Sequence, residues 1–296
     1  MESALIAAVR AVHFAAAIVL FGQFAYVGAV SPQREAPPGF ARITAWTCVL
    51  LLATLLLWLG LEALSMSGLP LREALGVQTL AVVATQTVFG RVWLARFALA
   101  GVLLLVVSFL YRHPSHRRAQ ALGAVLAALV LATIAGVGHG LAGKGADRAA
   151  HICADALHLL AAGAWLGGLL PLVLLLGRRD ALPLAVPATQ RFSTLGIACM
   201  AAILLSGVVN VWYMVADVPA LVHTSYGLMV LAKISLFLLI IVLAGINRSV
   251  LAPRLLAGDA ALVSLRRNAI AECVLGFGIV AIVGQLGITV PGPHMH

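Results

Sequence analysis

Charged residues are scarce in this chain of 296 amino acids: Asp, Glu, Lys and Arg make up 10% of it, against 62% for hydrophobic residues. A soluble domain carries about 25% charged residues, so this composition excludes that class. The chain also lacks a phosphate-binding P-loop, a nucleophile elbow and a dinucleotide-binding fingerprint. Nothing in it therefore indicates ATP hydrolysis or acyl transfer, and we expect a protein that is not an enzyme.

Cysteine is also rare, and the positions of the few cysteines argue against a structural role in disulfides. All 4 fall inside apolar segments, and no Cys-x-x-Cys pair occurs. They are Cys48, Cys153, Cys199 and Cys273. Small buried thiols are the simplest interpretation of this pattern.

What the chain has in abundance is long apolar runs, and runs of about 20 residues cross a bilayer as helices. We predict eight such spans, at about 4–30, 41–66, 88–111, 119–138, 149–176, 190–216, 225–248 and 267–290. The apolar segment 70–86 is shorter and opens with Arg72 and Glu73, so we expect an interfacial or re-entrant helix there. The sequence therefore predicts an all-α polytopic membrane protein.

The two halves of the sequence resemble each other. The segment from Thr87 to Arg96 returns in the segment from Thr224 to Lys233, with glycine, leucine and alanine in matching places. Similarly, His13 and the alanines that follow it match His158. Because four helices per half is an even number, both halves enter the membrane in the same sense. We therefore predict two parallel four-helix repeats, 1–140 and 141–296, with 70–86 as an addition to the first.

The basic residues of the loops predict the orientation. Four lie in the even-numbered loops, and they are Arg72, Arg91, Lys144 and Arg148. Twelve lie in the odd-numbered loops, and they are Arg34, Arg42, Arg112, Arg117, Arg118, Arg178, Arg179, Arg191, Arg248, Arg254, Arg266 and Arg267. Loops rich in Arg and Lys stay in the cytoplasm, so both termini are expected outside it. The charges are scattered, which disfavours a nucleic-acid surface.

The strongest candidate for chemistry is the start of the fifth predicted span. His151, Asp155 and His158 recur there at helical spacing, so one face of the helix carries all three. Ionisable groups at membrane depth usually face the bundle interior or a wet cavity. A carboxylate flanked by two imidazoles suits a metal ion, while a polar network that seals helix contacts is the alternative.

The matching histidine of the first span extends this candidate. If a pseudo-axis runs between the first and fifth spans, His13 and His158 face each other at one depth, and Arg10 pairs with Asp155. Imidazole, thiol and thioether groups on the same side favour copper, Cu(I) in particular. Besides Cys153, these further ligand candidates are His139, Met214, His223, His294, Met295 and His296.

Three other ionisable groups lie inside predicted spans. Arg96 and Lys233 occupy matched positions, where either snorkelling to the outer interface or pairing with an acid is possible. Glu272 lies near the inner end of the last span, where the first half has Gly123. It could relay protons, bind a passing ion, or simply snorkel inward.

The run from His151 through Trp165 to Gly168 resembles the signature helix of the CopD/PcoD copper-resistance membrane proteins. Arg191-Phe192-Ser193, the stretch from Lys233 to Arg248, and the Arg-Arg pair that precedes Glu272 are also similar to that family. The resemblance implies an eight-helix protein of the bacterial inner membrane that moves copper from periplasm to cytoplasm. It also implies a small periplasmic copper carrier of the CopC type as a partner.

The leading hypothesis is therefore a copper permease without an ATP motor. One rival is a b-type haem or electron-transfer protein with His13 and His158 as axial ligands. Another is a copper-delivery factor for enzyme assembly, which would use the same residues without transport.

The orientation is directly testable. A reporter fused to either terminus should be active outside the cytoplasm, and one inserted at 113–116 should be active inside it, because the loop cations divide so unequally. A cytoplasmic terminus would contradict this topology and move the candidate site to the other face.

Overall fold

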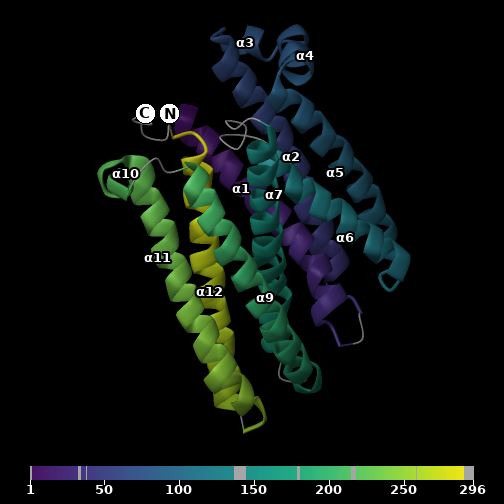
Figure 1. Cartoon of the computed structure of the whole chain (residues 1–296). Coiled ribbons are helices and arrows are strands. Elements are labelled where there is room, and N and C mark those ends of the chain that lie inside the picture. Colours follow the sequence, from purple (N-terminus) through teal and green to yellow (C-terminus); the bar gives the residue numbers. More distant parts are fainter. Residues whose placement is uncertain are drawn as a thin grey trace.

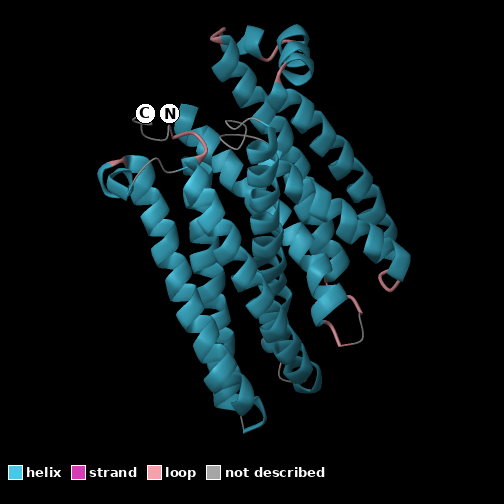
Figure 2. Ribbon diagram, viewed as in Figure 1, coloured by secondary structure: helices cyan, strands magenta, loops and turns pink. Residues whose placement is uncertain are grey.

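The structure is a computed structural model that describes residues 2–32, 35–37, 39–136, 145–178, 181–214, 218–257 and 259–289. Those residues form helices and connecting turns without any strand (Figure 2). Because lipid offers no hydrogen-bond partners, a chain this apolar satisfies its backbone within helices.

Eight helical segments are long and apolar enough to cross a membrane, as predicted. They are Ser3–Val30, Phe40–Ser67, Val88–Arg112, Arg117–Ala135, Asp147–Leu176, Leu182–Tyr213, Ser225–Leu255 and Ala260–Leu286.

The helices of the first half are α1 (Glu2–Ala25), η1 (Tyr26–Val30), α2 (Phe40–Ser67), α3 (Leu71–Ala74), α4 (Val77–Gln86), α5 (Val88–Arg112), α6 (Arg117–Ala132) and η2 (Thr133–Gly136). Those of the second half are α7 (Gly145–Ala162), η4 (Gly163–Gly167), α8 (Gly168–Leu176), α9 (Leu182–Met214), α10 (Val218–His223), α11 (Ser225–Ile246), η6 (Asn247–Leu251), η7 (Ala252–Ala257) and α12 (Asp259–Leu286). α1 begins and α12 ends at the same end of the bundle, here called the termini end (Figure 1).

Two spans begin earlier than the sequence suggested. α9 starts at Leu182 instead of 190, and α12 starts at Asp259 instead of 267. Both early turns carry polar or proline residues, which end an apolar run without ending a helix. Proline close to a helix start is tolerated because its missing N–H has no partner there anyway.

The segment 70–86 is not a ninth span. It forms α3 and α4, two short helices at the termini end of the bundle, and α4 packs against α2 and α5 (Figure 1). The connection before Thr224 in the second half contains the short helix α10 (Val218–His223). Thr87 and Thr224 then cap the helices that follow, since each hydroxyl accepts a hydrogen bond from the N–H three residues on.

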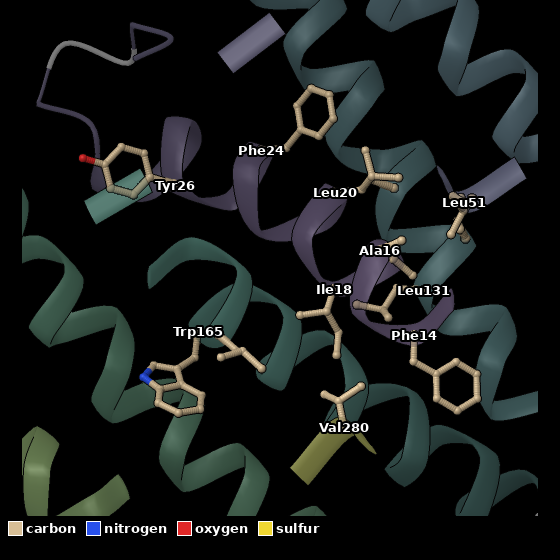
Figure 3. Packing of buried hydrophobic residues seen from close by; sticks show 14 of the residues in the cluster. Phe14, Ala16, Ile18, Leu20, Phe24, Tyr26, Leu51, Leu131, Trp165 and Val280 are labelled. Atoms are coloured by element: carbon tan, nitrogen blue, oxygen red, sulfur yellow. The ribbon is translucent and has the colours of Figure 1, made fainter. Parts of the chain in front are cut away.

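α1 is the central helix of the molecule. It packs against α2 and α6 of its own half and against η4, α8 and α12 of the other half. Its side chains Phe14, Ile18, Leu20 and Phe24 lie among residues of α2, α6, η4 and α12 (Figure 3). The core therefore follows α1.

Backbones of the two halves meet where α1 crosses η4. A Cβ added to Gly22 would lie 2.2 Å from the carbonyl carbon of Gly167, and one added to Gly167 would lie 2.1 Å from the Ile18 oxygen. Real Cβ atoms do not come so close, so only glycine fits at either position. Small residues are how membrane helices bring their backbones together.

Replacing Gly22 by Ala should therefore force α1 and η4 apart and destabilise the protein by about 1–3 kcal/mol or more, as overpacking does. Thermal or denaturant unfolding of the purified protein in detergent measures this change. Gly28→Ala is the matched control, because an added Cβ there meets nothing within 4 Å. Equal stability of the two variants would contradict the importance of the crossing.

Candidate functional site: two buried polar clusters

Polar side chains gather in two clusters in the half of the bundle nearer the termini end. The α1 cluster consists of Arg10, His13, Thr54, Trp58, Glu62, Arg96 and Thr133. The α7 cluster consists of His151, Asp155, His158, Ser206, Asn210, Tyr213 and Lys233. Each is centred on one of the two matching histidines.

His13 in the α1 cluster is fully buried and uses both ring nitrogens. Its Nδ1 lies 3.0 Å from the Thr54 hydroxyl, and its Nε2 lies 3.4 Å from Nη1 of Arg96. A guanidinium only donates, so Nε2 is the acceptor and Nδ1 carries the proton. The Thr54 hydroxyl in turn donates to the backbone oxygens of Leu50 and Leu51. The network is thus complete around this imidazole.

Arg96 points inward and not toward the outer interface. It is 1% exposed, and its Nε and Nη2 atoms donate to the hydroxyl and the carbonyl oxygen of Thr133 at 2.8 and 3.0 Å. Its guanidinium also lies 5.6 Å from the ring centroid of Trp58, a cation–π contact. These contacts tie α5 to α1, α2 and η2.

Arg10 also lies over Trp58, with its guanidinium 5.0 Å from the ring centroid. The carboxylate that acts on it electrostatically is Glu62, which accepts the indole N–H of Trp58 at 2.9 Å. The expected pairing of Arg10 with Asp155 is therefore absent: the acid near Arg10 comes from α2.

His158 in the α7 cluster makes the same contact as His13 on one side only. Its Nδ1 lies 3.1 Å from the Ser206 hydroxyl, which donates its own proton to the carbonyl oxygen of Ala202. The hydroxyl therefore accepts from Nδ1–H, and Nε2 keeps its lone pair. That nitrogen has no hydrogen-bond partner among the described residues, and the residue is less completely buried than His13.

The other two residues of the predicted stripe contact the same helix, α9. Asp155 accepts a hydrogen bond from the Asn210 amide at 3.2 Å, and His151 stacks on Tyr213 with ring centroids 4.9 Å apart. The carboxylate of Asp155 also interacts electrostatically with Lys233 of α11 and with His151. The other amide atom of Asn210, Oδ1, is buried without a partner.

The two histidines are held by different helices, and that they face each other across one site stays a prediction. His13 contacts α2 and α5, whereas His158 contacts α9, and they share no partner. The physical reason is the crossing at Gly22 and Gly167. Within the α7–η4–α8 segment, α1 packs on η4 and α8 and only slightly on α7, so α1 and α7 diverge toward the termini end.

The remaining ligand candidates are not brought into the α7 cluster by the described residues. His223 ends α10 and is exposed, as is Cys153. His139, His294, Met295 and His296 lie outside the described residues, and so does the side chain of Met214. Across the described ranges, no three His, Cys, Asp or Glu side chains are grouped closely enough to form a metal site by themselves.

Sequence reasoning missed the hydroxyl partners Thr54 and Ser206. Each is buried inside an apolar span and fixes the tautomer of one histidine. The available signal was weak, because a lone Thr or Ser in a membrane helix usually bonds to its own backbone.

Comparisons with known proteins bear on these clusters. Two family models match: Copper resistance protein D at residues 186–286, and Copper resistance protein D-like, N-terminal domain, at residues 1–150. Copper resistance protein D of Pseudomonas syringae pv. tomato is 33% identical over 80% of this chain and 77% of its own.

Two further relatives carry different names. Inner membrane protein YebZ of Escherichia coli strain K12 is 30% identical over 84% of each chain. Copper transport protein CutJ of Bacillus subtilis strain 168 is 36% identical over 34% of this chain and 19% of its own. No solved structure gives a significant match.

Proposed function

Because the chain belongs to the copper resistance protein D family, we propose that it carries copper across the bacterial inner membrane, from periplasm to cytoplasm. The eight apolar spans and the copper-handling family support this function. The observation that carries it is His158, an imidazole held inside a membrane protein with one nitrogen fixed and the other able to bind a metal.

Copper is the cargo, and the α7 cluster is the site we propose for it. A histidine whose Nδ1–H is held by an oxygen presents Nε2 to a metal in the correct orientation. Asp155 offers a carboxylate oxygen beside it, and the unpartnered Oδ1 of Asn210 is a second oxygen that a cation would satisfy. His151 lies one turn from Asp155 and two turns from His158, toward the termini end, where an arriving ion would meet it first.

Lys233 lowers the affinity of this site for copper. Its ammonium group interacts with Asp155, so an arriving copper ion competes with an internal cation. A transported ion needs a site strong enough to enter and weak enough to leave. Soft groups that we propose as additional ligands, with Cu(I) as the preferred state, are His139, Met214, His223, His294, Met295 and His296.

We propose that residues 1–140 and 141–296 are two copies of one repeat, and that the α1 cluster is the structural counterpart of this site in the first copy. Matching hydrogen bonds support the repeat: His13 to Thr54 corresponds to His158 to Ser206, and the caps of α5 and α11 correspond as well. In the α1 cluster, however, Arg96 holds the nitrogen that a metal would need. A fixed positive charge at that atom opposes copper binding.

On the basis of the loop cations we propose that the termini end lies in the periplasm, so that the α7 cluster takes up copper there, from a CopC-type carrier or directly. The haem alternative requires His13 and His158 to reach one iron. Their separate partners on α2, α5 and α9 speak against it.

Replacing His158 by Ala should remove most copper binding, because it deletes the one nitrogen that is oriented toward a metal. Ser206→Ala should weaken the affinity about 10–100-fold, as the loss of a residue that orients a ligand typically does. Titration of the purified protein with Cu(I) against a competing chelator measures both effects.

His13→Ala should leave copper affinity unchanged and lower thermal stability instead. The substitution removes the hydrogen bonds of His13 to Thr54 and Arg96, in a cluster that we propose binds no metal. His116→Ala is the control on an exposed loop. Unchanged affinity in the His158 variant, or a loss in the His13 variant equal to it, would contradict the proposed site.

A further inference from the structure

A cavity of about 390 Å³ lies in the second half, toward the end of the bundle opposite the termini end. α8, α9, α11 and α12 enclose it, together with Trp165 of η4 and Asn247 of η6. It is lined by Gly196 and Met200, then by Thr189 and Glu272, and beyond these by Leu176 and Leu265. We refer to it as the inner cavity.

The first half has side chains and helix contacts in the space that corresponds to the inner cavity of the second half. α2 packs along α5, whereas α9 and α11 make no comparable contact along their described residues. In the first half Phe24 presses on Gly123, where an added Cβ would lie 2.5 Å from its ring. The corresponding pair in the second half is Leu169 and Glu272, and both line the inner cavity. Leu169 is smaller than Phe24, so no aromatic ring fills the space beside Glu272 in the second half.

The inner cavity begins beyond His158 along the same segment. Its lining starts at Trp165 of η4 and continues with Leu169 and Leu172 of α8. On the opposite wall, a Cβ added to Gly207 would lie 3.7 Å from the His158 ring. Leu204, Met200 and Gly196 follow along α9 and line the cavity. The cavity therefore begins about one turn of α9 beyond Gly207, and His158 itself does not line it.

Below Met200 the inner cavity meets buried polar groups. Glu272 is 3% exposed and accepts a hydrogen bond from the Asn247 amide, whose oxygen accepts one from Asn268 at 3.0 Å. Thr189 is 5% exposed, and its hydroxyl has no partner among the described residues. A carboxylate buried in a membrane helix is costly and is normally retained for an ion or a proton pathway.

We propose that the inner cavity is the inner half of the copper path and that Glu272 is its exit ligand, with the Met200 thioether as a station between them. Only the second half conducts; the first half supports it. The proposal rests on the proposed transport of copper. Thioether sulfur binds Cu(I) well, and a carboxylate binds it weakly, so affinity falls toward the exit and favours release.

The first test blocks the cavity. Gly196→Leu places a side chain into it, because the nearest atom to an added Cβ, in Trp165, is 4.0 Å away. We expect copper uptake into sealed membrane vesicles to fall at least about tenfold, while Cu(I) binding by the purified protein stays at the wild-type value. Gly101→Leu is the matched control, since its Cβ would meet nothing within 4 Å in the first half.

The second test changes the exit ligand without changing its shape. Glu272→Gln keeps the side-chain oxygen that accepts the hydrogen bond from Asn247, so this variant is expected to fold. It therefore tests the path even if Gly196→Leu proves unstable. Uptake should again fall, with binding at the α7 cluster unchanged, and Met200→Leu should give a smaller loss of the same kind.

The outcomes separate the two proposals. Normal uptake by both Gly196→Leu and Glu272→Gln would overturn the inner path and leave copper transport intact; the cavity would then hold a lipid chain. Absence of uptake by the wild-type protein, despite copper binding, would overturn the transport function and the path together.

Discussion

The backbone contact between Gly22 and Gly167 determines the arrangement of the whole bundle. Helices in lipid gain nothing from excluding water from each other, so they associate where small residues allow close packing. This contact joins α1 of the first half to η4 of the second, and it makes α1 the core of both halves. It also sets how far apart the helices lie at the level of the two histidines. The separate polar clusters follow from it.

The sequence alone predicted the eight spans and the polar face of α7 well. Long apolar runs have one physical solution in lipid, and helical spacing places His151, Asp155 and His158 on one face. That face does meet a single helix, since their partners Tyr213, Asn210 and Ser206 all belong to α9. Helix starts rich in charge or proline, as in α9 and α12, were predicted too late because hydropathy does not detect them.

The sequence could not predict which way His13 turns. Matching positions in a repeat are equidistant from the axis, but spacing alone does not say whether they face it. Here the helices have already diverged at that depth, and Thr54 and Arg96 offer His13 a complete set of partners. Nor could a pattern of apolar residues distinguish the plugged first half from the hollow second half. That difference depends on the volume of single side chains, such as Phe24 against Leu169.

The Gly22–Gly167 contact has a mechanical consequence as well. Two glycines touching backbone to backbone have no side chains to interlock, so the helices can tilt about this point with little loss of contact. Gly167 lies midway in sequence between His158 and Leu176, which lines the inner cavity. Any tilt of the α7–η4–α8 segment about this pivot moves those two ends in opposite directions, as a lever does. In the proposed path, widening at one end would thereby be coupled to narrowing at the other.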